Sequence, residues 1–260
     1  MSGETAGLAV IAEIIFRKVR LFMVRSYSGS FLSNPEWHHH TSIDLKSRFV
    51  RTNPEIRGSG PSYRKWNSRA VEHKMTELYA GASMRKVVLG VGISLDGYIA
   101  RPDGAVDFLF MPKDYSMAAF FKRIDTAVMG WKTYEMGLKL GGGNVSTPGI
   151  RSYVFSRMQE AGERDGLTFV NEPPKRLVEG LRKKGGKDIW LMGGGELTRE
   201  FLRDDLVDEL YLGVVPVLIG EGIPAFPSGF PERKFTLAEN NTYSKGLIAL
   251  RYERRKGQKK

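Results

Sequence analysis

Beyond residue 83, short apolar runs alternate with amphipathic segments. Residues 86–93 are rich in Val, Leu and Ile, which predicts a buried strand. Residues 173–183 begin with Pro, carry an apolar stripe and precede two glycines, which predicts a helix. The same criteria predict strands at 126–129, 152–155, 189–192 and 206–217, helices at 115–124, 132–138 and 196–202, and a closing hairpin at 235–242 and 246–252. Strands that alternate with helices indicate an α/β fold, here with three layers, a mostly parallel central sheet and a C-terminal antiparallel hairpin.

Residues 1–83 have a different sequence pattern, because Ser, Asn, Gly, Pro and His are scattered among them without a sustained hydrophobic periodicity. Their apolar run at 8–16 is interrupted by Glu13 and is shorter than the about 20 residues that span a bilayer. We therefore expect an irregular basic extension, disordered or a mis-assigned start, followed by one domain at 84–254 and a basic tail at 255–260. Met84 directly precedes the first predicted strand, so we hypothesise that it is the genuine start.

The composition excludes several kinds of chemistry. The chain has no cysteine, which removes disulfides, thiol catalysis and zinc sites that need Cys, and favours a reducing, cytoplasmic compartment. All four histidines precede residue 84, so proton transfer in the domain falls to Asp, Glu, Tyr, Lys or water. The net charge is +11, but no nucleic-acid-binding motif is present, and we expect neither a nucleic-acid nor a membrane partner.

The strongest local signal is Gly193-Gly194-Gly195, between an apolar run and an amphipathic run. Glycine lets backbone N–H groups approach a ligand closely, and the following helix presents unpaired N–H groups and the positive end of its dipole. A phosphate group fits such a turn, although a turn without a ligand explains the same pattern. Two familiar nucleotide motifs fail nearby, because Leu95 breaks the dinucleotide fingerprint and Tyr98 stands where a P-loop needs Lys.

Three further motifs also follow predicted strands. Residues 92–100 contain Ser-Leu-Asp-Gly, residues 130–133 read Gly-Trp-Lys-Thr, and residues 156–157 read Ser-Arg. In open α/β sheets, ligands bind at the carboxyl ends of strands. A helix start with a cation and a hydroxyl, a guanidinium, and a glycine turn all suit phosphate. Each motif alone has an ordinary structural explanation, but the four together favour a nucleotide site.

These ordered motifs resemble those of the dihydrofolate-reductase-like superfamily, specifically the reductase domain of bacterial riboflavin biosynthesis and its stand-alone relatives. The resemblance covers residues 84–254 and implies an NADPH-dependent oxidoreductase that acts on a small molecule, and often a homodimer. It also implies that the Gly-Gly bond of the glycine turn is often cis. The cofactor-binding residues that it implies are Ile99, Ala100, Gly130, Trp131, Lys132, Thr133, Ser156, Arg157, Gly193, Gly194, Gly195, Glu196 and Leu197.

The resemblance assigns a role to each group. Gly130, Lys132 and Thr133 would hold the pyrophosphate side of NADPH, and 156–157 the adenosine 2′-phosphate. Residues 193–197 would wrap the nicotinamide half. Ile99 and Ala100 would pack near the nicotinamide ring. Asp96 would face the substrate, and Asp96, Glu196 or water would move the proton.

Three departures from the family's motifs limit the functions that the resemblance implies. Trp131 replaces the usual Arg, which removes one phosphate contact. Met117 stands where dihydrofolate reductases carry an acid, and Asp114 is a weak substitute. The absence of cysteine excludes the zinc deaminase half of the riboflavin enzyme. The implied function is 5-amino-6-(5-phosphoribosylamino)uracil reductase, with hydride transfer to a pyrimidine-type substrate. Dihydrofolate or pterin reduction and non-catalytic nucleotide binding remain alternatives.

Overall fold

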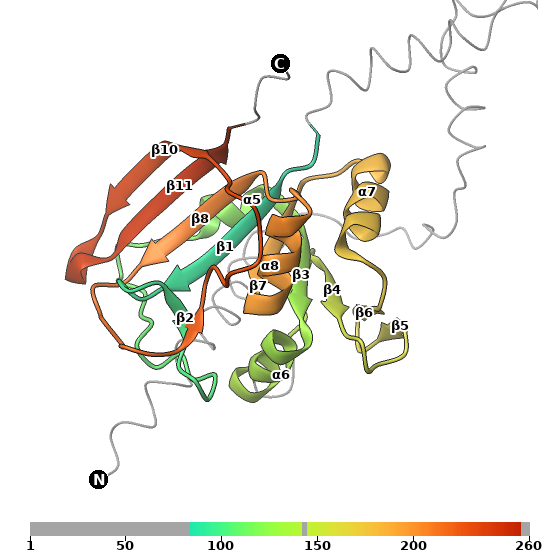
Figure 1. The fold of residues 1–260 in the computed structure, drawn as a ribbon, viewed down its shortest axis with the longest axis horizontal. Coiled ribbons are helices and arrows are strands. Elements are labelled where there is room, and N and C mark those ends of the chain that lie inside the picture. Colours follow the sequence, from blue (N-terminus) through green and yellow to red (C-terminus); the bar gives the residue numbers. More distant parts are fainter. Residues whose placement is uncertain (1–83, 142–144, 256–260) are drawn as a thin grey trace, which may run out of the picture. The chain divides into compact units, whose positions relative to one another are not determined.

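A computed structural model of the chain describes residues 84–141 and 145–255. The predicted extension and most of the predicted basic tail therefore lie outside the described residues. Figure 1 shows the described part as one twisted sheet with helices on both faces. No helix among these residues is long and apolar enough to cross a membrane.

The main sheet has nine strands in the order β10-β11-β8-β1-β7-β3-β4-β6-β5. Six neighbouring strands are parallel: β8 (Glu209–Val214), β1 (Val87–Ile93), β7 (Asp188–Gly193), β3 (Ile124–Gly130), β4 (Arg151–Phe155) and β6 (Leu167–Val170). The outer strands are antiparallel: β10 (Phe235–Thr242), β11 (Ile248–Arg254) and β5 (Gly162–Arg164). The predicted parallel sheet with a C-terminal hairpin is confirmed.

Successive side chains of each central strand point to opposite faces of the sheet and pack in two separate cores. Val87 and Leu89 face a core that is completed by α7 (Pro174–Lys184) and α8 (Gly195–Arg203). Val88 faces the opposite core, with α5 (Ala118–Lys122). In Figure 1, α7 and α8 lie in front of the sheet and α5 lies behind it. Helix α6 (Trp131–Leu140) packs on the α5 side, over β4 and β6. The three predicted layers are present.

Some predicted boundaries were wrong. The helix expected at 115–124 is reduced to the five residues of α5, because Arg123 ends it and Ile124 already belongs to β3. The strand expected at 206–217 is limited to β8, since Leu206 and Val207 are buried in the connection that precedes it. The sequence also concealed β5, β6 and the small pair β2 (Tyr98–Ala100) and β9 (Ile223–Pro224), all of which have four residues or fewer.

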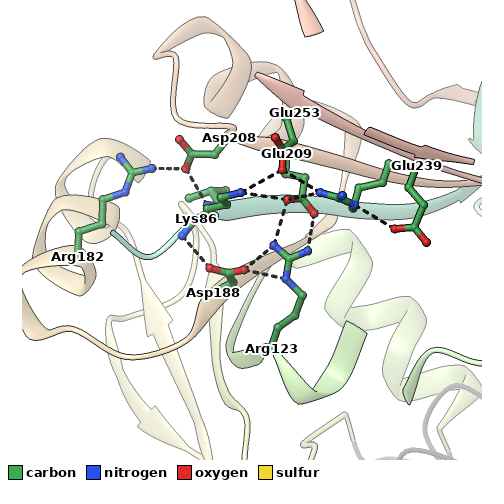
Figure 2. A network of polar contacts seen from close by, with 10 residues as sticks. Lys86, Arg123, Arg182, Asp188, Asp208, Glu209, Glu239 and Glu253 are labelled. Atoms are coloured by element: carbon green, nitrogen blue, oxygen red, sulfur yellow. Dashed lines mark hydrogen bonds and ion pairs between the residues drawn. The ribbon is translucent and has the colours of Figure 1, made fainter. Parts of the chain in front are cut away.

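A network of charged side chains crosses the amino ends of the strands (Figure 2). Glu209, the first residue of β8, is fully buried and accepts hydrogen bonds from the Arg123 guanidinium at 2.6 and 3.0 Å. Arg123 also donates to Asp188 at the start of β7, at 2.6 and 2.8 Å. Lys86 and Arg251 each lie 3.6 Å from Glu209. Three cations therefore balance the buried carboxylate, and the network joins β1, β7, β8, β11 and the end of α5.

Candidate functional site

The four predicted motifs follow β1, β7, β3 and β4, which are consecutive neighbours in the sheet. Their carboxyl ends meet at one edge, because the strands are parallel and in register. Met129 of β3 pairs with Gly193 of β7, and Gly130 pairs with Phe155 of β4. The motifs, which are spread over 100 residues of sequence, thus lie side by side.

The glycine turn lies directly against the start of α6. Gly193 and Gly194 have φ angles of 108° and 92°, a region that side-chain-bearing residues rarely adopt. A Cβ atom at position 194 would lie 3.1 Å from the Thr133 hydroxyl and 3.8 Å from the Gly130 nitrogen. Gly195 begins α8 and is packed against the Pro224 carbonyl. Only glycine therefore allows these two loops to approach so closely. The described residues contain no cis peptide bond, so the cis bond implied for this turn is not found.

Two helices begin at this contact without a side-chain cap. Gly130 precedes α6 and Gly194 precedes α8, and neither can offer a capping oxygen. Their first-turn N–H groups and the positive ends of both dipoles lie at one place. Lys132 is exposed in the first turn of α6 and, among the described residues, its side chain has no hydrogen bond or ion pair. The neighbouring Leu197 is buried, whereas Glu196 is exposed in the first turn of α8. The arrangement suits a polyphosphate ligand.

Trp131 contributes to packing. Its ring lies 5.3 Å from the ring of Tyr134 and 6.3 Å from that of Phe169. Trp131 therefore packs α6 against β6, the strand that contains Phe169. This contact accounts for an indole at a position where the resemblance expects a guanidinium.

Ser156 and Arg157 follow β4. Ser156 is buried, and its hydroxyl oxygen accepts hydrogen bonds from the N–H groups of Met158 and Gln159, at 3.2 and 3.1 Å. The Arg157 side chain is 81% exposed and donates to Glu200 of α8 at 2.6 Å. Sequence reasoning missed Glu200, whose only signal was its spacing of four residues from Glu196 on the predicted helix.

Asp96 follows β1 and is exposed. Its carboxylate accepts a hydrogen bond from the Ser94 hydroxyl at 2.6 Å, and from the N–H groups of Gly220 and Ile219 at 2.8 and 3.1 Å. These donors, Ser94 first, hold the pKa of Asp96 below its usual value. The carboxylate is therefore ionised at neutral pH and joins the β1–β2 turn to the loop after β8. Ile99 and Ala100 lie beyond it in β2, packed toward the core.

The opposite side of β1 is covered by residues 101–121, of which sequence reasoning considered only Asp114 and Met117 for the site. A Cβ atom at Gly92 would lie 3.2 Å from Leu109, so the 101–117 segment reaches over the end of β1. Met117 and Phe121 are half-buried beside Trp190. Asp114 is held by the N–H and hydroxyl of Ser244, which lower its pKa, so its carboxylate is already bound.

A hollow of about 520 Å³ lies at the amino ends of the strands, away from these motifs. Arg85 lines it, and its buried guanidinium donates to Asp125, Thr126 and the carbonyls of Lys187 and Gly185. Those partners give Arg85 a structural role. No group of three or more potential metal ligands occurs in residues 84–141 and 145–255. The candidate site is therefore the carboxyl edge of the sheet, where the two uncapped helix starts and Lys132 lie.

The fold is that of an α/β protein, and its candidate ligand-binding face is built from four neighbouring strand ends. Residues 85–249 match the model of the RibD C-terminal domain, and the chain belongs to that family. YwjB and YyaP of Bacillus subtilis (strain 168), both called uncharacterized, are 33% and 31% identical over 178 residues. These alignments cover 65% of this chain and 98% and 94% of the two relatives.

Solved structures share the fold. A pyrimidine reductase-like protein (DIP1392) of Corynebacterium diphtheriae superposes with a TM-score of 0.53 at 17% identity, over 66% of this chain and 93% of the other. A diaminohydroxyphosphoribosylaminopyrimidine deaminase/5-amino-6-(5-phosphoribosylamino)uracil reductase of Thermotoga maritima gives 0.51 at 16% identity, over 71% of this chain and 62% of its own length. The expected reductase-type fold is confirmed.

Proposed function

We propose that this protein is an NADPH-dependent reductase that transfers hydride to a pyrimidine-type small molecule, in the manner of 5-amino-6-(5-phosphoribosylamino)uracil reductase. Membership of the RibD C-terminal domain family supports a reductase. The name of the Thermotoga maritima protein supports a phosphoribosylated pyrimidine as the substrate class. The proposal includes a cytoplasmic location and a homodimer, the latter to be tested by light scattering of the purified protein.

The observation that carries the proposal is the contact between Gly194 and the start of α6, at Gly130 and Thr133. It brings two uncapped helix starts and the unpaired Lys132 to one place, which suits the pyrophosphate of a dinucleotide. Residues 193–197 then border the nicotinamide half, with Ile99 and Ala100 beside the ring. Ser156 and Arg157 lie at the next strand end, where they would receive the adenosine 2′-phosphate.

The coenzyme, when bound, supplies the hydride, and the protein positions the two reactants. Asp96 lies on the substrate side as an ionised acceptor, so its carboxylate can orient a hydroxyl of the substrate while it holds the 219–220 turn. Glu196, exposed at the start of α8, or a water molecule is the candidate proton donor. The segment at 101–117 covers the opposite side of β1, where Leu109 lies against Gly92.

Binding of coenzyme is tested by titrating the protein with NADPH and NADH, reading fluorescence transfer and thermal stability. A ligand at about 100 times its Kd adds about 2.7 kcal/mol to stability, which a melting curve resolves. If neither coenzyme produces a signal, the proposal fails. Oxidation of NADPH against pyrimidine, pterin, quinone and simple carbonyl compounds then identifies the substrate class.

Non-catalytic nucleotide binding is the second candidate, because Trp131 packs on Phe169 and leaves one fewer cation at the phosphate face. Pterin reduction is less favoured, since position 117 is Met and Asp114 is bound by Ser244. An Asp96→Asn variant separates an enzyme from a binding protein. In an enzyme, turnover falls while NADPH binding survives, whereas a binding protein has no turnover to lose.

A further inference from the structure

Arg157 and Glu200 form an ion pair that spans the end of β3. Arg157 follows β4, whereas Glu200 lies on α8, which follows β7, and β3 separates these two strands in the sheet. Their side chains meet at 2.6 Å. Glu200 is 18% exposed and Arg157 is 81% exposed, so the carboxylate is held by the helix and the guanidinium extends into solvent.

The pair leaves little free positive charge at the end of β4. Among the described residues, Glu200 is the only charged partner of Arg157. The Ser156 oxygen already accepts two N–H groups, so this side chain can offer a ligand only its hydroxyl proton. A dianionic group that approaches Arg157 therefore meets a cation that is already neutralised, with a carboxylate beside it.

An exposed ion pair is weak and exchanges readily, whereas a phosphate can take two donors from one guanidinium. Exchange is thus possible, but the displaced Glu200 carboxylate remains close to the phosphate, since its helix is packed on the sheet. The repulsion acts on a ligand with a 2′-phosphate and spares a ligand without one.

We propose that Glu200 is a specificity-determining residue, which competes with the coenzyme 2′-phosphate for Arg157 and so reduces the preference for NADPH over NADH. The proposal rests on the proposed function, because it assumes that the coenzyme adenosine lies at the end of β4. On this proposal, coenzyme selectivity depends on whether Arg157 pairs with Glu200 or with the 2′-phosphate.

The test compares wild type, Glu200→Gln, Arg157→Gln and the double variant. Affinities for NADPH, NADH, adenosine 2′,5′-bisphosphate and AMP are measured by calorimetry or fluorescence. Removing a like charge at this range should tighten NADPH and the bisphosphate by about three- to tenfold and leave NADH and AMP unchanged. Arg157→Gln should weaken only the 2′-phosphorylated ligands, and in the double variant the gain from Glu200→Gln should disappear.

Glu179→Gln is the matched control, because Glu179 is exposed on α7 and has no ion pair among the described residues. It removes the same charge from the chain and should leave the ratio of NADPH to NADH affinity unchanged. If Glu200→Gln behaves like this control, or weakens NADPH, the role of Glu200 is overturned while the coenzyme site stands. If neither coenzyme binds to wild type, the proposed function fails and this proposal fails with it.

Discussion

Gly194 and Thr133 lie so close together that a Cβ atom at position 194 would be 3.1 Å from the Thr133 hydroxyl oxygen. The two residues are 61 positions apart in the sequence: Thr133 lies in the first turn of α6, which follows β3, and Gly194 lies between β7 and α8. Their contact makes one continuous backbone surface from the two helix starts. The positive φ angle favours glycine, and the tight contact with the Thr133 hydroxyl adds to the cost of any Cβ atom.

We therefore expect Gly194→Ala to lower both stability and coenzyme affinity. The φ of 92° strains any residue with a Cβ, at a cost of about 1–3 kcal/mol. The free energy of unfolding in urea and the Kd for NADPH measure the two effects. Gly180→Ala is the control, because Gly180 lies within α7 and a Cβ there would meet nothing within 4 Å. That change should stabilise the protein by about 0.5–1 kcal/mol. Equal effects of the two substitutions would contradict the role of the turn.

Substitution of Lys132 should lower the affinities for NADPH and NADH alike, whereas substitution of Arg157 should lower only the affinity for NADPH. Lys132 lies at the helix start assigned to the pyrophosphate, which NADPH and NADH share. Lys132→Gln should weaken both coenzymes by a similar factor, about tenfold or 1.4 kcal/mol, within the range for a hydrogen bond to a charged group. Lys139→Gln, in the last turn of the same helix, should leave both affinities unchanged. If Lys132→Gln weakened NADPH but not NADH, the pyrophosphate would not lie at the start of α6.

The buried carboxylate of Glu209 should be essential for stability. Replacement by Gln leaves the Arg123 guanidinium partly unpaired, and breaking a buried pair costs about 3–5 kcal/mol. Chemical denaturation should therefore show a large fall in the unfolding free energy of Glu209→Gln. Glu232→Gln removes a carboxylate that is 76% exposed and paired with Lys234, and should change stability by less than about 0.5 kcal/mol. A change of less than 1 kcal/mol in Glu209→Gln would show that the network contributes little.

The hydrogen bonds from the 219–220 turn to the Asp96 carboxylate should make the stability of that turn depend on pH. Its pKa is lowered in the folded protein, mainly by the Ser94 hydroxyl, so its contribution is complete above the unfolded pKa of about 3.9. That contribution is lost as the pH falls through the lower folded pKa. Between pH 6 and 8, hydrogen exchange at the Ile219 and Gly220 amides should be slow in wild type and faster in Asp96→Asn. As the pH falls through the lowered pKa of the folded protein the difference should shrink, and exchange that is equal at pH 7 would contradict the anchoring role.

Local patterns in the sequence predicted much of the fold and the position of the site. Residues 196–202 have a clear helical period, and α8 forms around them. The glycine triplet marked the turn before it, and Gly193 and Gly194 do adopt positive φ between β7 and α8. The sequence also predicted that the four motifs would lie together, because parallel strands place their carboxyl ends at one edge, and the strand order confirms that they are neighbours.

Contacts between distant segments were not predictable. The carboxylate of Asp96 is bound by Ile219 and Gly220, more than 120 residues away, and no local pattern indicates such a partner. The partner of Arg157 likewise depends on strand order, since α8 reaches it only because β7 and β4 flank β3. The length of α5 was overestimated for a related reason. Its apolar residues serve two elements, and Ile124 belongs to the strand.

The charged network at Glu209 lies at the amino ends of the strands, opposite the loops that form the candidate site (Figure 2). Residues that hold the sheet together are thus separate from the residues that we propose to contact the coenzyme. Substitutions in the segments that flank the shared motifs, such as 101–117, can therefore accumulate without disturbing this network. Divergence among family members should concentrate in those flanking segments rather than in the charged network or in the motifs themselves.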